Sequence, residues 1–302
     1  MPKIQYVAKR FGKSALERIA QVNAIIAEYT AQGYKLTLRQ LYYQLVSRDM
    51  IPNTVQSYKN LGSVVNDARL AGMIDWDAIE DRTRNLRSTP HWSSPRSIVR
   101  ACAQQFSVDM WETQDNYVEV YVEKDALVGV IEGVCNEFDV PYFACRGYTS
   151  QSEMWGAAMR LREREDAGKA TTIIHLGDHD PSGIDMSRDI QDRLAMFGSS
   201  ATVKRIALNW DQIDLYAPPP NPAKTTDSRY QTYEDLYGTE SWELDALEPK
   251  VISELIKGEI EYLIEQDAWI EQCERQAQGR EQLKMVADRW TEAIDLLENG
   301  DV

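Results

Sequence analysis

The sequence predicts an α/β protein in which a helical N-terminal module precedes a mostly parallel sheet and an acidic helical extension follows it. Three observations support this prediction. Residues 1–114 carry helical apolar patterns, residues 115–215 alternate β-rich runs with helical segments, and residues 216–302 begin with a Pro-rich stretch and continue as acidic helices. We take these three ranges as the predicted domains.

The N-terminal module contains three predicted helices. Residues 14–32 repeat apolar side chains at helical spacing and end at Gly33. Thr37 is a suitable N-cap for a second helix, and residues 55–70 form a third. Three helices with short connections, followed by the segment MIDWDAIEDR, are typical of a helix-turn-helix of the winged type. We therefore predict a winged-helix DNA-binding domain.

The period of the apolar residues changes from Tyr117 onward. Helical segments separate β-rich runs, which are 117–122, 140–145, 171–176 and 201–208. This alternation predicts parallel strands with helices on the faces of the sheet. The stretch APPPNPAK then ends the domain, because neither a helix nor a central strand tolerates so many prolines. Helical patterns resume at about Pro249.

The net charge of −15 is unevenly distributed. Residues 1–114 carry 15 Lys and Arg against 10 Asp and Glu, a net charge of +5, whereas 115–239 carry −9 and 240–302 carry −11. Affinity for DNA depends largely on cations that neutralise phosphates. The distribution is therefore compatible with a DNA contact made by the N-terminal module.

Several classes of protein are disfavoured. No apolar run approaches the roughly 18 to 20 residues of a membrane span, and the N-terminus lacks the apolar core of a signal peptide. The four cysteines form no C-x-x-C pair, and the three histidines lack the spacing of a zinc site. We expect a cytoplasmic, nucleoid-associated protein without a membrane partner.

Two of the predicted strands end in acidic residues. YVEVYV runs into Glu123, and TTIIHL runs into Asp178 and Asp180 of DHDPSG. Ligands of parallel sheets bind at the carboxyl ends of the strands, so neighbouring strands would bring these carboxylates together. Such oxygens suit Mg²⁺, with Mn²⁺ as a substitute. Alternatively, Glu123 favours the N-terminus of the next helix, and Asp178 and Asp180 cap the helix after Gly183.

These motifs resemble a known family. A strand ending in Glu, followed later by a strand ending in D-x-D, resembles the Toprim domain of topoisomerases, bacterial primases and a class of nucleases. The forms VEKDA and DHDPSG resemble the topoisomerase VI A subunit and its relative, the meiotic double-strand-break protein. In TLRQLYYQLV, Arg39, Tyr42 and Tyr43 match the R-x-φ-Y-Y segment of that family's winged-helix domain.

The resemblance implies a type IIB topoisomerase-like enzyme, an isomerase that cleaves double-stranded DNA. Tyr43 would be the nucleophile, with Tyr42 as the alternative, Arg39 would lie beside the scissile phosphate, and Glu123 would be both catalytic and a metal ligand. The product would be a 5′-phosphotyrosyl link. The family acts as a homodimer in which the tyrosine of one protomer faces the acids of the other. Because no nucleotide-binding glycine loop is present, an ATPase would be a separate subunit.

The sequence departs from the family in one motif. CRGYTSQSEMW keeps Gly147 but lacks the G-x-P-D and T-R of topoisomerase VI A subunits, and the chain is most similar to the short relatives that consist of an A subunit alone. Two alternatives therefore stay open. The first is a Toprim hydrolase in which the acids activate water and Tyr43 is structural. The second is a non-catalytic DNA-binding subunit.

A few residues near these motifs have two interpretations. Glu243 and Asp245 in SWELDALEP either add an acid to the metal site or are solvated. Lys224 and Arg229 either contact phosphate or hold their loop together. We expect Lys124 to be solvated, and His179 to point into solvent or at phosphate.

Overall fold

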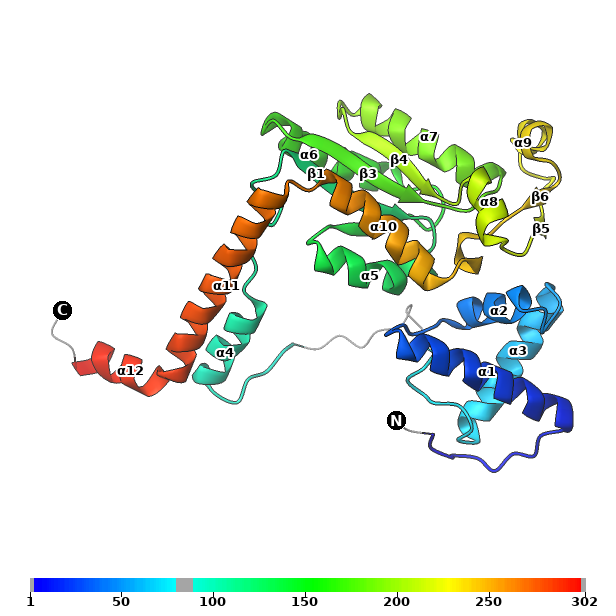
Figure 1. The fold of residues 1–302 in the computed structure, drawn as a ribbon, viewed down its shortest axis with the longest axis horizontal. Helices are drawn as coiled ribbons and strands as arrows, with labels where there is room; N and C mark the ends of the chain where they lie inside the picture. Colours follow the sequence, from blue (N-terminus) through cyan, green and yellow to red (C-terminus); the bar gives the residue numbers. More distant parts are fainter. Residues whose placement is uncertain (1–2, 80–88, 300–302) are drawn as a thin grey trace. The chain divides into compact units, whose positions relative to one another are not determined.

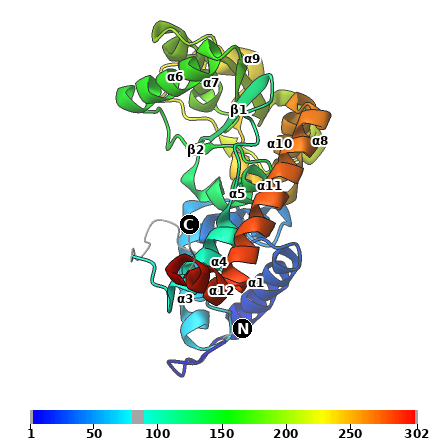
Figure 2. The same cartoon turned by 90° about the vertical axis from the view of Figure 1, so that its left-hand side faces the viewer.

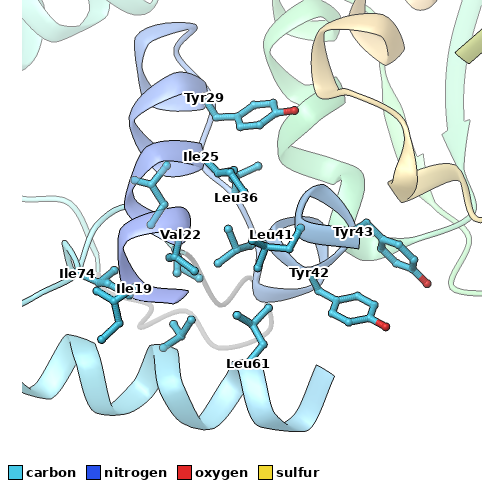
Figure 3. Close-up of a cluster of buried hydrophobic side chains, with 14 of the residues drawn as sticks. Ile19, Val22, Ile25, Tyr29, Leu36, Leu41, Tyr42, Tyr43, Leu61 and Ile74 are labelled. Carbon is cyan, nitrogen blue, oxygen red and sulfur yellow. The ribbon is translucent and has the colours of Figure 1, made fainter. Parts of the chain in front are cut away.

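The N-terminal helices pack around an apolar cluster. The computed structural model describes residues 3–79 and 89–299. Helices α1 (Lys13–Ala31), α2 (Leu38–Ser47) and α3 (Val55–Leu70) each place apolar side chains in the cluster, among them Ile25, Leu41 and Leu61 (Figure 3). Thr37 caps α2 as predicted, because its hydroxyl accepts a hydrogen bond from Gln40 N while the Gln40 side chain accepts one from Thr37 N.

The winged form of this module stays a prediction. After α3, the described residues up to 79 contain turns and the isolated bridges Gln5–Ala71 and Leu36–Ile79, but no β-hairpin. The last residues of the segment MIDWDAIEDR lie outside the described residues. Residues 3–79 therefore contain the three predicted helices, without the strands of a wing.

The predicted α/β fold with a parallel sheet is confirmed. Strands β1 (Asn116–Val122), β2 (Tyr142–Ala144), β3 (Ala170–Leu176) and β4 (Thr202–Ala207) form a parallel sheet in the order β2-β1-β3-β4. Strands β1 and β3 are neighbours, as the argument about the acidic residues requires. Their carboxyl ends consequently lie at the same edge of the sheet.

Helices cover both faces of this sheet. Figure 1 shows α6 (Gln151–Asp166) and α7 (Pro181–Met196) on one face, and α5 (Val128–Glu137) and α10 (Pro249–Leu263) on the other. The apolar residues of β1 are buried between these layers, which explains why the strand is apolar at nearly every position.

The segment between β4 and α10 contains short elements. They are α8 (Trp210–Tyr216), the antiparallel strands β5 (Asn221–Pro222) and β6 (Glu240–Ser241), α9 (Tyr230–Tyr237) and the 3₁₀ turn η2 (Leu244–Ala246); a similar turn, η1 (Asp125–Leu127), precedes α5. This segment also contains the acidic residues Glu243 and Asp245, which lie at η2.

The chain divides into two compact units that differ from the predicted domains. One comprises Met1–Arg84 with Val118–Tyr262, and the other Asn85–Tyr117 with Leu263–Val302. In the second unit, α4 (Pro95–Gln105) and α11 (Gln266–Asp288) run side by side (Figure 1 and Figure 2), and α12 (Trp290–Asn299) follows them. The ring of Phe106 packs where Gly279 has no side chain. Residues 216–262 and 263–302 thus fall in different units, and α11 pairs with α4.

Candidate functional site

The carboxyl ends of β1 and β3 bring Glu123 and Asp178 together. Glu123 N donates to Leu176 O at 2.9 Å, and Asp178 N donates to Glu123 Oε2 at 2.8 Å. A Cβ on Gly177 would lie 3.0 Å from the same oxygen, so a glycine suits this close approach. Burial raises the pKa of Glu123 above its ordinary value. The Glu123 side chain therefore fixes the loop that carries Asp178.

Asp180 caps helix α7. Its Oδ1 accepts hydrogen bonds from Gly183 N at 2.6 Å and Ser182 Oγ at 2.9 Å. A Cβ on Gly183 would lie only 2.3 Å from Asp178 O, so the turn requires glycine there. Of the two interpretations of Asp180, the structure shows the helix cap.

A second segment joins this edge of the sheet. His179 N donates to Trp242 O at 2.8 Å, and Trp242 N donates to His179 O at 2.9 Å, so the two segments form an antiparallel bridge. Two residues further on, Leu244 N donates to Asp178 Oδ1 at 2.8 Å. The residues on either side of Leu244 are both acidic, and they consequently lie beside Asp178.

Asp178, Glu243 and Asp245 form an acidic cluster that could hold a metal ion. One oxygen from each carboxylate lies within 4.8 Å of the other two. Carboxylate oxygens are the ligands that hard divalent cations prefer, and this donor set does not select one such cation over another. The predicted ligand set, Glu123, Asp178 and Asp180, shares only Asp178 with the cluster found among the described residues.

The ammonium of Lys124 lies within the acidic cluster. Its Nζ is 2.8 Å from Asp178 Oδ1 and 2.9 Å from Asp245 Oδ1, and it also contacts Glu243. Burial alone lowers the pKa of Lys124, but the carboxylates, first that of Asp245, raise it above its ordinary value. Burial has the opposite effect on Glu243 and by itself raises its pKa. The charge of Lys124 outweighs burial and lowers the pKa of Glu243 to about 2. The expectation that Lys124 is solvated is therefore wrong.

The acidic cluster fits a divalent cation in its donor chemistry and charge. Even with Lys124 beside it, burial raises the pKa of Asp178 well above its usual range. This carboxylate is therefore short of positive charge. A divalent cation would supply that charge, and it would compete with Lys124 Nζ for the same oxygens.

Arg39 connects helix α2 to the acidic cluster. Its Nε donates to Asp245 Oδ2 at 2.7 Å, and its Nη2 donates to Glu243 Oε2 at 2.8 Å. The guanidinium carbon lies 5.6 Å from the centre of the Tyr43 ring, within the range of a cation–π interaction. The resemblance implied a tyrosine that faces the acids of the other protomer. In the structure, Arg39 and Tyr43 lie beside the acids of their own chain.

The two tyrosines of α2 have different environments. Tyr42 donates its hydroxyl to Asn53 Oδ1 at 2.9 Å, whereas the hydroxyl of Tyr43 makes no hydrogen bond within residues 3–79 and 89–299. Figure 3 shows both rings leaving α2 on the side away from α1. Burial, and then the charges of Glu243 and Asp245, raise the pKa of Tyr43 to about 12. Tyr43 is therefore protonated at neutral pH.

The structure shows the surroundings of His179, Arg229 and Lys224. His179 is buried among aromatic rings, and its Nδ1 lies 2.8 Å from the Tyr233 hydroxyl, so it does not point into solvent. Arg229 is bonded to Asp227 and Asp185 and holds its loop together. The Lys224 side chain is 73% exposed, and its Nζ lies 3.8 Å from Asp180 Oδ2.

Sequence reasoning missed Arg205 altogether. Its Nη2 donates to Asp178 O at 2.7 Å and to Gly177 O at 2.9 Å, and its Nη1 donates to Gly183 O at 2.9 Å. A single buried guanidinium thus fixes the carbonyl groups of the acidic loop. Arg205 lies in the β-rich run of β4, where no local pattern distinguishes it from a solvated strand residue.

Comparisons with protein-family models, curated proteins and solved structures found no match for this chain. No helix within the described residues combines the length and the apolar character of a membrane span.

Proposed function

We propose that this chain is a Mg²⁺-dependent DNA-cleaving enzyme that uses Tyr43 as its nucleophile. The observation that carries the proposal is the position of the Tyr43 hydroxyl. It makes no hydrogen bond to a described residue, and its ring lies beside a guanidinium that is bonded to the acidic cluster. A nucleophile, a phosphate-binding cation and a set of metal ligands therefore adjoin one another, which is the set of groups that phosphodiester transesterification needs.

The reaction would exchange one phosphoester bond for another. Tyr43 Oη loses its proton and bonds to the phosphorus, while the bond from phosphorus to the 3′ oxygen of DNA breaks and that oxygen takes up a proton. Arg39 would bind the phosphate through its guanidinium. Bound to Asp178, Glu243 and Asp245, Mg²⁺ would offset the negative charge that builds on the phosphate oxygens. The raised pKa of Tyr43 makes such cations necessary, since a phenol is otherwise a weak nucleophile at neutral pH.

The finer assignments belong to the same proposal. The parallel sheet with acids at the carboxyl ends of β1 and β3 is compatible with a Toprim core, and we propose that α1 to α3 are the helices of a winged-helix domain. Cutting both strands of a duplex would take two copies of the chain. Glu123, which the resemblance implies to be catalytic, is proposed here to act by positioning Asp178, because its carboxylate accepts the Asp178 backbone N–H.

One experiment separates this proposal from its two alternatives. Supercoiled plasmid is incubated with the protein and Mg²⁺ or Mn²⁺, the reaction is stopped with denaturant, and covalent attachment of protein to DNA ends is measured. The variants are Tyr43→Phe and Asp178→Ala. We expect attachment with the wild type and none with either variant.

The other outcomes identify the alternatives. Free DNA ends from both wild type and Tyr43→Phe, lost only in Asp178→Ala, would show a hydrolase in which the acidic cluster activates water. DNA binding without any cleavage, with either metal and with linear or supercoiled substrate, would show a non-catalytic subunit.

A further inference from the structure

A pocket of about 400 Å³ opens beside the proposed nucleophile. Helix α2, the start of α3 and strand β5 form its walls, and Tyr43 and Arg39 both line it. We propose that this pocket receives a single nucleobase, turned out of the DNA stack next to the phosphate that Tyr43 attacks. The inference extends the proposed function, because it names the form of DNA that the site takes.

The walls of the pocket are aromatic. The rings of Tyr42 and Tyr43 lie 5.2 Å apart at 69°, and those of Tyr42 and Tyr58 lie 5.3 Å apart at 84°. Each pair meets edge to face, and such a contact covers at most one face of one ring. Tyr42 and Tyr43 are only 5% and 6% exposed, whereas Tyr58 is 36% exposed, so the Tyr58 ring is the one that is open to a flat ligand. Stacking on tyrosine is the usual way in which proteins hold unpaired bases, and every base offers a π-face.

The polar groups of the pocket suit the edge of a base. Asn53 Nδ2 donates to Asn221 Oδ1 at 2.6 Å, which fixes the two amides relative to each other. The side-chain Nδ2 of Asn221 has no partner within the part of the chain that the structure describes, so it can donate to a ring nitrogen or carbonyl oxygen of a base. Pockets for small ligands are typically lined by aromatic and apolar side chains with a small number of precisely placed polar groups.

The charged residues of the pocket are paired with each other. Arg39 and Glu243 both line it, and Arg39 Nη2 donates to Glu243 Oε2 at 2.8 Å. The guanidinium that would bind the phosphate therefore lies in the wall beside Tyr43, and the other lining side chains are uncharged and suit a base. The sugar-phosphate backbone would remain at the mouth of the pocket.

The size of the pocket sets the form of the substrate. A volume of about 400 Å³ holds a ligand of the size of one nucleoside, and a base pair within a helix cannot enter it. A base must therefore be unpaired or extruded to reach the tyrosines, at a cost that is lowest in single-stranded or mismatched DNA. We infer that the site prefers DNA in which the strands are locally separated.

The test compares two single strands that differ only in their bases. One is a fluorescein-labelled strand of twelve thymidine nucleotides, and the other has twelve abasic residues and the same phosphates. The dissociation constants are measured by anisotropy in EDTA, so the result does not depend on cleavage. We expect the wild type to bind the thymidine strand about tenfold more tightly, in keeping with roughly 1–3 kcal/mol for one stacked base.

Tyr58→Ala should remove this difference without weakening the binding of the abasic strand. Tyr58 is 36% exposed, so its replacement is compatible with folding. Asn221→Leu is a second variant, which should reduce the difference by filling the pocket and removing its donor. Tyr262→Ala is the matched control, because this tyrosine is 80% exposed on α10 and does not line the pocket.

Equal binding of both strands by the wild type, or a difference that survives both Tyr58→Ala and Asn221→Leu, would overturn the inference. The assay is repeated in the Tyr43→Phe background to keep it separate from the proposed function. A base-dependent difference together with a wild type that never cuts DNA would leave the pocket in place and reject the nucleophile. Cleavage through Tyr43 with no base-dependent binding would do the reverse.

Discussion

Arg39 Nε lies 2.7 Å from Asp245 Oδ2, joining two residues that are 206 positions apart in the chain. The Arg39 side chain is 43% exposed, whereas that of Asp245 is fully buried. This ion pair places helix α2, with its tyrosines, against the acidic cluster. It is the contact through which the proposed nucleophile and the proposed metal ligands become parts of a single site.

Replacing Lys124 by Met should destabilise the metal-free protein by about 3 kcal/mol, because three carboxylates would lose the ammonium that they share and only Glu243 and Asp245 would keep Arg39 as a counter-ion. The same change should strengthen the response to metal, since a divalent cation no longer competes with an ammonium. Thermal melting in EDTA and in Mg²⁺ or Mn²⁺ measures both effects. Lys250→Met is the control, because that side chain is 62% exposed and pairs with Glu254 on the surface of α10. An equal metal-induced shift in the wild type and Lys124→Met would contradict the account.

Tyr42→Phe and Tyr43→Phe should have opposite effects on stability and on DNA cleavage. Tyr42 loses a hydrogen bond to Asn53, so its variant should lose about 1 kcal/mol of stability and retain DNA cleavage. The Tyr43 hydroxyl makes no hydrogen bond to a described residue, so Tyr43→Phe should keep the stability of the wild type. It should lose the covalent attachment of protein to DNA. Urea unfolding and plasmid cleavage of both variants test this. Cleavage lost in Tyr42→Phe and retained in Tyr43→Phe would reverse the assignment.

His175 should make the protein sensitive to acid. Burial lowers the pKa of His175 to about 3, from an ordinary value near 6.5. Between these values the unfolded chain binds a proton that the folded chain does not, so stability is present above about pH 6.5 and is lost as the pH falls toward 3.

His175→Asn removes this proton uptake but keeps a polar atom near Ser187 Oγ, which lies 2.7 Å from His175 Nδ1. The stability gap between the wild type and this variant should therefore shrink by about 2 kcal/mol from pH 7.5 to pH 5.0. Urea unfolding at the two pH values measures it, with His91→Asn at an exposed position as the control. A gap that is constant with pH would refute the prediction.

Gly183→Ala should destabilise the protein by about 1–3 kcal/mol, because the new Cβ would lie 2.3 Å from Asp178 O and 3.1 Å from Glu123 Oε2. Gly258→Ala in α10 is a matched substitution with open space around the new Cβ, and it should be neutral or slightly stabilising. Thermal melting of both variants checks the pair. Equal effects would mean that the loop between β3 and α7 is less tightly packed than the structure shows.

The fold followed from the sequence because its elements have local signals. The period of the apolar residues locates α1, α3 and the strands to within a residue or two, and Thr37 marks the start of α2. The pairing of α4 with α11 had no such signal. It depends on the fit of Phe106 against Gly279, and residues so far apart in the chain leave no shared pattern in a single sequence.

The site was predictable only in part. Asp178 and Asp180 look equivalent in DHDPSG, and only the turn at Gly183 makes Asp180 a helix cap. The acidic pair around Leu244 was visible as a pattern, but its place beside Asp178 depends on a bridge between distant segments. Lys124 follows Glu123 directly, and no local feature showed that its ammonium is buried among carboxylates.

The most direct measurement is to identify the residue that carries DNA after cleavage. The protein is trapped on plasmid in Mg²⁺, the DNA is digested with nuclease, and tryptic peptides are analysed by mass spectrometry. Residues 40–48 form one tryptic peptide that contains both tyrosines of α2. The account predicts a nucleotide adduct on this peptide, located at Tyr43 by fragmentation and absent from Asp178→Ala. Cut DNA with no adduct, or an adduct on any other residue, would contradict it.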